Sequence, residues 1–181
     1  MTGTAGISGT GLLAILREKH LRKRFPRAFI EGAQGFVQNL SIEREARISC
    51  SFAPQLMMPV EEGGIFRALW MLGQEMQAGF QLDLKAIPIL QETIEICEWL
   101  DINPYQLYGT GALLIVTDRG EELCEALLLS GARASVLGRM TGANARILQN
   151  GEEARYLEKP QQDTLWAAWT GEEETPRSLE A

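Results

Sequence analysis

The stretch Gly109-Thr110-Gly111-Ala112-Leu113-Leu114-Ile115-Val116-Thr117 joins a glycine turn to an unbroken apolar run. A short apolar run between turn signals is typical of a strand that is buried on both faces. A helical pattern follows over residues 121–129 and ends before Gly131, a residue type that commonly closes helices. A buried strand followed directly by a helix predicts an α/β (α+β) fold, in which a mixed β-sheet packs against helices.

The chain on both sides of this stretch alternates between helical and extended patterns. Before it, we expect helices over 12–25, 26–38, 41–52, 65–76 and 90–100, with Ser41 as an N-cap and Gly79 as a C-cap, strands over 55–58 and 80–84, and a turn over 59–64. After it, we expect a strand over 134–137, a hairpin around Asn150-Gly151, and a short helix with Leu165, Trp166 and Trp169. That last helix either packs on the sheet or forms an interface. We interpret residues 1–170 as one domain and the polar stretch 171–181 as a disordered tail.

The composition narrows the class of protein. The net charge of −7 argues against a nucleic-acid partner, and no apolar segment reaches the roughly 20 residues that cross a membrane. Three widely spaced cysteines and an unremarkable first segment favour a cytoplasmic protein with buried thiols. The run 17–24 is basic, which favours a solvated helix face and leaves an anion or partner site as the alternative.

A more specific signal comes from the order of several short motifs along the chain. The motifs are Gly9-Thr10-Gly11-Leu12-Leu13-Ala14, Leu40-Ser41-Ile42-Glu43-Arg44-Glu45-Ala46, Glu62-Gly63-Gly64-Ile65, Ala86-Ile87-Pro88-Ile89, Asp101-Ile102-Asn103-Pro104-Tyr105-Gln106-Leu107, Gly109-Thr110-Gly111-Ala112-Leu113-Leu114-Ile115 and Val136-Leu137-Gly138-Arg139-Met140-Thr141. In this order they resemble the C-terminal domain of the aminoimidazole ribonucleotide (AIR) synthase superfamily, from about Gly9 to Trp166. The resemblance is strongest to the hydrogenase-maturation and AIR-synthase-related branch.

The resemblance implies an AIR synthase C-terminal-domain-like fold and a particular division of labour. Family members are two-domain ATP-dependent enzymes, in which the N-terminal domain supplies the Mg²⁺ ligands, most of the ATP site and most of the dimer contact. The C-terminal domain covers the cleft and helps to hold substrate or phosphate. The 181 residues include no such nucleotide-binding domain, so we expect no cofactor for the isolated chain. ATP and Mg²⁺ enter only if a nucleotide-binding partner exists.

Four places along the chain are candidate anion or ligand sites. Glycines let a backbone approach an anion, and the amides at a helix N-terminus attract negative charge. Each place also has a structural interpretation: a helix entry, close packing, a sharp turn or a surface ion pair. The candidate residues are Gly9, Thr10 and Gly11; Glu62, Gly63 and Gly64; Gly109, Thr110 and Gly111; and Arg139.

The family's chemistry is not matched at one decisive position. In catalytic relatives the run before the long helix is His-Asp-x-Thr-Glu-Gly-Gly. Aligned on Glu62-Gly63-Gly64, its His and Asp positions fall on Met58 and Pro59, which neither transfer a proton nor bind a hard metal. His20 is the only histidine, and the aspartates are scattered. We therefore predict no catalytic residue and no metal site.

Two functions remain open. The first is a non-catalytic binding or assembly module, and the second is one subunit of a split ATP-dependent synthase, dehydratase or kinase. The expected partners are a second copy of the chain (a homo-oligomer) or a separate nucleotide-binding-domain protein, with no nucleic acid and no membrane.

Overall fold

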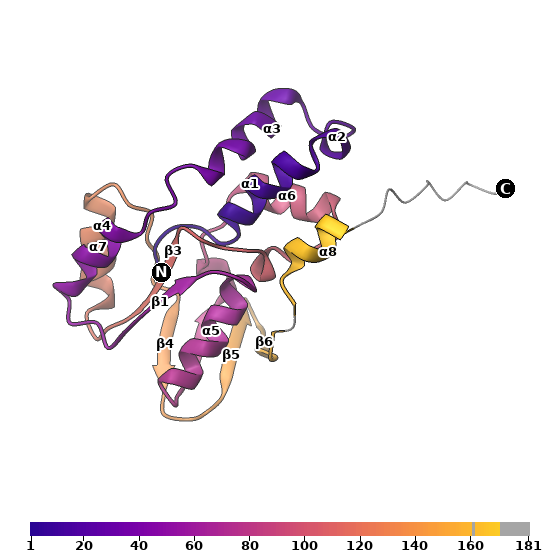
Figure 1. Ribbon diagram of the computed structural model, residues 1–181. Coiled ribbons are helices and arrows are strands. Elements are labelled where there is room, and N and C mark those ends of the chain that lie inside the picture. The colour runs from indigo at the N-terminus through magenta and orange to yellow at the C-terminus, as the bar shows by residue number, and fades with distance from the viewer. Residues whose placement is uncertain (161, 171–181) are drawn as a thin grey trace.

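The computed structural model describes residues 1–160 and 162–170. Helices gather at one end of the molecule and a strand-rich layer lies at the other, with helix α5 (Gly64–Glu75) packed on the strands (Figure 1). The expected fold class, a mixed sheet packed with helices, is confirmed. The polar stretch 171–181 lies outside the described residues. Among the described residues, no helix is long and apolar enough to span a membrane.

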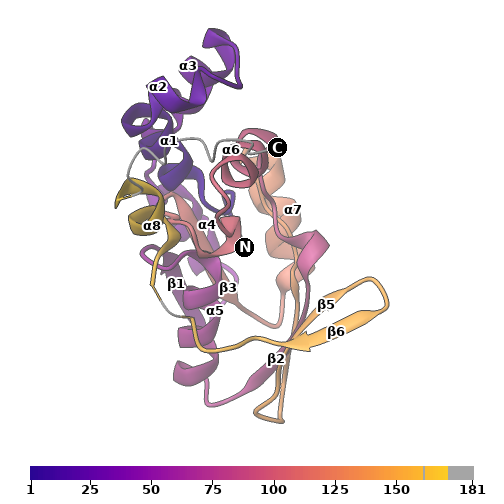
Figure 2. The same cartoon turned by 90° about the vertical axis from the view of Figure 1, so that its right-hand side faces the viewer.

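A four-stranded mixed sheet forms the base of the molecule. It has the order β4 (Gly138–Thr141), β2 (Gly79–Asp83), β5 (Arg146–Asn150) and β6 (Glu153–Tyr156). Strand β2 runs antiparallel to β4 and parallel to β5, and β5 and β6 form an antiparallel hairpin. Asn150 pairs with Glu153 across the turn, so the hairpin that Asn150-Gly151 predicts is confirmed. Figure 2 shows this hairpin projecting away from the helices.

A second, two-stranded sheet pairs β1 (Leu56–Val60) antiparallel with β3 (Ala112–Val116), the strand of the opening apolar run. Pro59 lies inside β1, although the sequence predicts a turn there. Because β1 pairs with β3 alone, it is an edge strand, where proline is tolerated.

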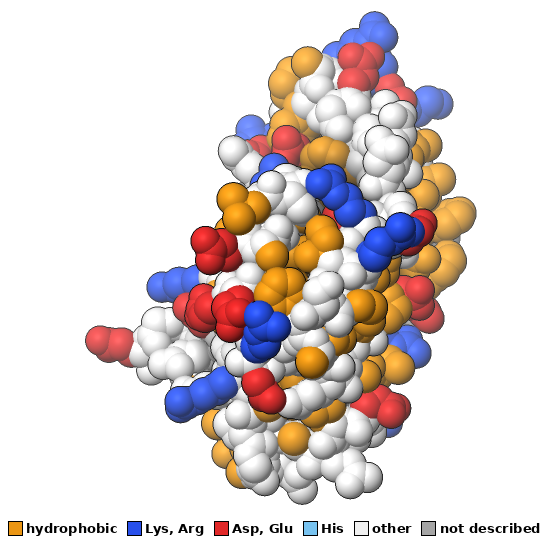
Figure 3. Space-filling view, turned by 90° about the vertical axis from the view of Figure 1, so that its left-hand side faces the viewer, with side chains coloured by type: hydrophobic (Ala, Val, Ile, Leu, Met, Phe, Trp, Pro, Cys, Tyr) orange, Lys and Arg blue, Asp and Glu red, His pale blue; other side chains and the backbone are white. Residues whose placement is uncertain are grey.

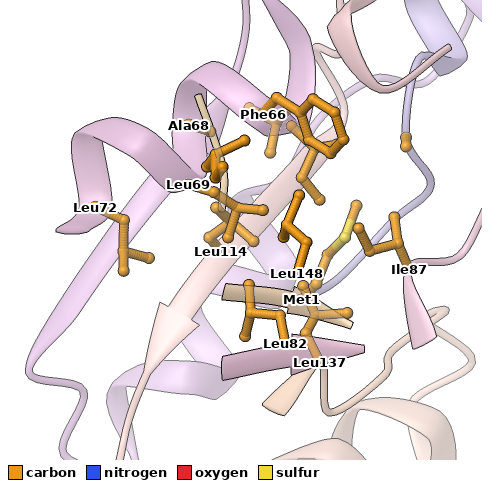
Figure 4. Close-up of a cluster of buried hydrophobic side chains, with 14 of the residues drawn as sticks. Met1, Phe66, Ala68, Leu69, Leu72, Leu82, Ile87, Leu114, Leu137 and Leu148 are labelled. Carbon is orange, nitrogen blue, oxygen red and sulfur yellow. The ribbon is translucent and has the colours of Figure 1, made fainter. Parts of the chain in front are cut away.

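The main core lies between α5 and the strands. Alternate residues of β2, including Phe80 and Leu82, point toward Leu69 and Leu72 of α5. Figure 4 shows Met1, Leu82, Leu114, Leu137 and Leu148 converging from segments far apart in the sequence. Each Å² of apolar surface that is removed from water contributes about 25 cal/mol to the free energy of folding. This cluster is therefore the main source of stability for the strand-rich layer.

The helical end has a separate core. Leu13, Leu21, Ile30, Ile96 and Leu165 are all almost completely buried in it. The elements that contribute to this end of the molecule are α1 (Ile7–Leu16), α2 (Glu18–Leu21), α3 (Arg27–Gln34), η1 (Gly35–Val37), α6 (Gln91–Trp99), η3 (Pro104–Gln106) and α8 (Thr164–Thr170).

Helix α8 packs on α1 rather than on the sheet. The Arg17 guanidinium donates to the Ala168 carbonyl at 2.6 Å, and Leu165 is buried. The rings of Trp166 and Trp169 stack with centroids 5.5 Å apart and stay about half exposed. Packing on the sheet is therefore wrong for these two tryptophans, while the interface interpretation stays a prediction.

Three expected elements differ in the structure. Residues 134–137 form no strand, because Ala134 makes a single bridge with Thr2, and the strand begins at Gly138. Gly79 does not close α5 but starts β2, where a Cβ would lie 2.1 Å from the Ala143 carbonyl oxygen. The first helix begins at Ile7 and breaks at Arg17, earlier than the pattern over 12–25 predicts.

The remaining described elements agree in type with the sequence. Ser41 lies one residue before the observed N-cap, Ile42, although its hydroxyl accepts from the Glu43 amide at 3.4 Å. The elements are α4 (Glu43–Cys50) and α7 (Gly120–Leu129). Leu84, the last residue of the strand expected over 80–84, instead begins the 3-10 turn η2 (Leu84–Ala86).

Candidate functional site

The glycine motifs, far apart in the sequence, meet around residues 104–109. A Cβ on Gly64 would lie 2.6 Å from the Leu107 carbonyl oxygen, and one on Gly9 would lie 2.8 Å from the Tyr108 carbonyl oxygen. The Gly109 amide donates to the Glu61 carbonyl at 3.2 Å. We call the contact of Gly6, Gly9 and Gly64 with residues 104–109 the glycine junction. Its glycines allow backbones to touch, since a side chain on Gly9 or Gly64 would collide with Leu107 or a carbonyl oxygen, and Gly6 has a φ of 67° that side chains rarely adopt.

Gly9, Thr10 and Gly11 lie inside α1, not before a helix as the sequence predicts. The Gly9 amide donates to the Tyr108 carbonyl at 2.9 Å. The Thr10 hydroxyl donates to the Gly6 carbonyl at 2.8 Å and lies 2.9 Å from the Thr93 hydroxyl oxygen. All three residues are buried, so their groups hold α1 in place. Their role as an anion site stays a prediction.

Helix α5 begins at the glycine junction with two residues in the left-handed region, Gly63 (φ 77°) and Gly64 (φ 62°). The Gly63 amide donates to a carboxylate oxygen of Asp163 at 2.6 Å. Glu62 instead lies 3.5 Å from the guanidinium of Arg67, in an exposed ion pair. The amide expected to attract an external anion is thus bound to a carboxylate of the chain itself.

Asp163 is the site residue that sequence reasoning missed. It is 1% exposed, and its second oxygen accepts from the Tyr108 amide at 3.2 Å and the Leu165 amide at 2.8 Å. Burial raises the pKa of the Asp163 carboxyl, against the opposing effect of the three amide donors. An Asp just before an apolar helix is an N-cap signal, which would have found the bond to Leu165. The bonds to Gly63 and Tyr108 leave no trace in the sequence.

Gly109, Thr110 and Gly111 turn the chain from the glycine junction into β3. Gly111 has a φ of 104°, and a Cβ on Gly3 would lie 2.4 Å from its carbonyl oxygen. The turn interpretation accounts for this geometry, and ligand binding by these residues stays a prediction. Met58 and Pro59 lie on β1, where they pair with Leu114 and Leu113.

Arg139 lies apart from the glycine junction, on β4. Its guanidinium donates to the Gln81 side chain at 3.2 Å. It lines a groove of about 500 Å³ that runs between β4 and α7. The floor of the groove is apolar and includes Leu72, Leu82 and Leu123.

The histidine and the cysteines are the remaining side chains that the sequence analysis weighed. His20 is half-buried, with its ring 5.7 Å from that of Trp99. The described part of the chain holds no group of three or more His, Cys, Asp or Glu side chains placed to bind a metal ion. Cys50, Cys97 and Cys124 are free thiols. Only Cys97 is buried, where desolvation raises its pKa to about 12, so the expectation that all three are buried is wrong.

Comparison with known proteins agrees with the fold. No protein-family model matches the chain. The carbamoyl dehydratase HypE of Azotobacter vinelandii is 27% identical over 119 residues, which cover 64% of this chain and 33% of that protein. The HypE of Rhizobium leguminosarum bv. viciae is 27% identical over 99 residues, or 52% of this chain and 28% of that protein.

Solved structures extend the match over most of the chain. The hydrogenase maturation protein HypE of E. coli superposes with a TM-score of 0.72 at 17% identity, over 89% of this chain and 49% of its own. The thiamine-monophosphate kinase of Stenotrophomonas maltophilia K279a gives a TM-score of 0.60 at 14% identity, over 85% of this chain and 49% of its own. The chain thus spans about half the length of these solved proteins and about a third of the curated relatives it matches.

The chain therefore has the fold of the AIR-synthase-related proteins. The resemblance predicted from the sequence, to one domain of these proteins and to their hydrogenase-maturation branch, is confirmed.

Proposed function

We propose that this domain is a non-catalytic binding or assembly module of the AIR-synthase-related class. The observation that carries the proposal is the state of the α5 N-terminus. There the chain's own Asp163 carboxylate accepts the Gly63 amide, and the Tyr108 amide bonds to the same carboxylate. A bound phosphate at this amide would have to displace a buried carboxylate that makes three hydrogen bonds, and two negative charges would repel each other there.

The side chains nearby support the same conclusion. Met58 and Pro59 occupy the positions at which catalytic relatives carry His and Asp, and neither side chain has a proton to transfer. Glu61 and Glu62 add negative charge just before α5, which further disfavours an anionic ligand. We also propose a cytoplasmic location, which the free thiols support because they suit a reducing compartment.

The alternative function is one half of an ATP-dependent enzyme. What supports it is that the chain spans only about half the length of each solved relative. One such relative is a HypE in complex with ATP, and another is a HypE–HypF complex. In this alternative, a nucleotide-binding domain outside these residues supplies the ATP and Mg²⁺ site.

Calorimetric titration of the purified chain with ATP–Mg²⁺, and separately with inorganic phosphate, tests the proposal. We expect no heat of binding from either. Micromolar ATP binding accompanied by ATP turnover would overturn the module interpretation. For the alternative, the decisive assay is ATP hydrolysis by the chain mixed with a candidate nucleotide-binding-domain protein. Turnover that occurs only in the mixture would favour the split enzyme.

A further inference from the structure

A cluster of cationic side chains lies at one end of this acidic protein. Residues 17–27 hold six of the seventeen Lys and Arg side chains and a single carboxylate, Glu18. Glu18 pairs with Arg22, whereas Lys19, Lys23 and Arg24 are exposed and form no ion pair with any described residue. Ile15 and Leu16 lie beside them, 47% and 44% exposed. We call residues 15–24 the basic end.

Helix α7 shows the opposite combination. Residues 118–129 hold four carboxylates and one cation, Arg119, which pairs with Glu122 at 2.5 Å. Glu121, Glu125, Leu128 and Leu129 follow helical spacing, so they line one side of α7. Leu128 and Leu129 are 54% and 83% exposed, the highest values for leucines in the described chain. We call residues 118–129 the acidic face.

The surroundings of the acidic face leave it available for contact. Arg44 donates to the Ser130 carbonyl beyond the last turn of α7 and pairs with none of these carboxylates. The apolar groove toward β4 runs along the helix and includes Asp118, Glu121 and Glu122 in its wall. On the side of the molecule that carries α4 and α7, apolar side chains reach the surface between charged ones (Figure 3).

The two surfaces cannot meet within one molecule. Helix α2 stands at the helical end, and α7 lies across the molecule beside α4, on opposite sides in both ribbon views (Figures 1 and 2). They are nevertheless matched, since each combines two exposed aliphatic side chains with an excess of one charge. Opposite charges steer association and set the register, and burial of the aliphatic side chains supplies affinity.

We propose that copies of this chain associate head to tail, with the basic end of one copy seated on the acidic face of the next. A second copy is the occupant that the charges favour, because the chain itself carries both halves of the complementary pair. The contact is heterologous, so it leaves one free surface at each end and builds a ring or an open chain. The inference goes beyond the proposed function, because it names the partner and uses no residue of the glycine junction.

The test is sedimentation velocity over a range of protein concentrations, at about 20 mM and about 500 mM salt, where screening weakens exposed charge pairs. We expect concentration-dependent association at low salt that weakens at high salt. The double variant Lys23→Glu/Arg24→Glu and the double variant Glu121→Lys/Glu125→Lys should each raise the dissociation constant about tenfold or more. Lys85→Glu, on η2 and outside both surfaces, is the matched control and should associate like the natural chain.

Mixing the two double variants gives the sharpest readout. Each variant alone has lost one of the two complementary surfaces, but in an equimolar mixture the unchanged basic end of the Glu121→Lys/Glu125→Lys variant can again contact the unchanged acidic face of the other variant. We expect the mixture to recover association, with far-UV circular dichroism showing that both variants are folded. A natural chain that stays monomeric at every concentration would overturn the proposal. So would self-association that both reversals leave unchanged, or a mixture that stays monomeric.

Discussion

Helices α5 and α7 both begin with a glycine that follows a strand, and a pair of glutamates stands beside each start. At α5, a Cβ on Gly64 would lie 2.6 Å from a backbone carbonyl oxygen, and Gly63 donates to a buried carboxylate. At α7, no atom outside the neighbouring residues and backbone of the helix itself lies within 4 Å of the place where a Cβ on Gly120 would stand. One helix start is closed by the protein itself, and the other opens to solvent beside a groove.

The difference shows that a glycine at the start of a helix does not by itself indicate whether the helix N-terminus is closed or open to solvent. At α5, the glycine permits backbone contact and the helix N-terminus is satisfied internally, so the site is part of the fold. At α7, the same residue type is under no such constraint, and the charged first turn faces outward, where it is free to meet a partner. Closed and open helix starts should therefore respond differently to the same substitutions.

The largest expected effect is that of Gly64→Ala. Alanine at a φ of 62° costs about 1–2 kcal/mol, and its Cβ would also press on the Leu107 and Tyr105 carbonyl oxygens, for a total of roughly 3 kcal/mol or more. Urea denaturation should show a lower transition midpoint with an unchanged slope. A loss below about 1 kcal/mol would mean that the glycine junction yields easily, and the contrast with α7 would fail.

The next effect is that of Asp163→Ala, which leaves three backbone amides without their acceptor. We expect a loss of about 2 kcal/mol in the free energy of unfolding. Asp118→Ala is the matched control, because Asp118 accepts one exposed bond from Gln55, and its loss should stay below about 0.5 kcal/mol. Equal losses for the two variants would show that Asp163 does not hold α5, Tyr108 and α8 together.

The same variant has a pH signature. Burial raises the pKa of Asp163 above that of the unfolded chain, so the folded state holds this proton more tightly. Its contribution to stability is therefore fully present below the unfolded pKa and is lost as the pH rises through the folded pKa. The stability difference between the natural chain and Asp163→Ala should widen on acidification from neutral pH toward pH 4. A stability difference that narrows on acidification would mean that the amide donors lower the pKa of Asp163 by more than burial raises it.

Most helices, strands and turns were predictable where one local signal in the sequence, such as an apolar run or a turn motif, decides the conformation. The apolar run at β3, the helical pattern over 65–76 at α5, and the turn at Asn150-Gly151 each predict an element that the structure contains. Predictions failed where a distant segment decides the conformation. A glycine is required at position 79 because the backbone of residues 143–145 approaches it closely. Residues 134–137 form no strand, because Ala134 and Ser135 instead bond to the short segment at Met1 and Thr2.

The candidate site was predictable only in part, for the same reason. The motifs Gly9-Thr10-Gly11, Glu62-Gly63-Gly64 and Gly109-Thr110-Gly111 mark places of close backbone approach, and the structure brings them to or beside one junction. What satisfies that junction is Asp163, which lies about a hundred residues from Gly63 in the sequence. No local pattern reports such a bond, and glycine motifs read alone therefore suggest a ligand where the fold has supplied its own carboxylate.

The smallest expected effect completes the comparison of the two helix starts. Gly120→Ala adds a methyl group where no atom outside the neighbouring residues and backbone of the helix itself lies within 4 Å, and it removes conformational freedom from the unfolded chain. We expect a gain of about 0.5 kcal/mol in urea denaturation, opposite in sign to the effect of Gly64→Ala. Because the methyl group changes no charge on the acidic face, head-to-tail association should keep its salt dependence. A loss of more than about 1 kcal/mol in the free energy of unfolding would show that the start of α7 is constrained as well. The contrast between a closed start at α5 and an open start at α7 would then fail.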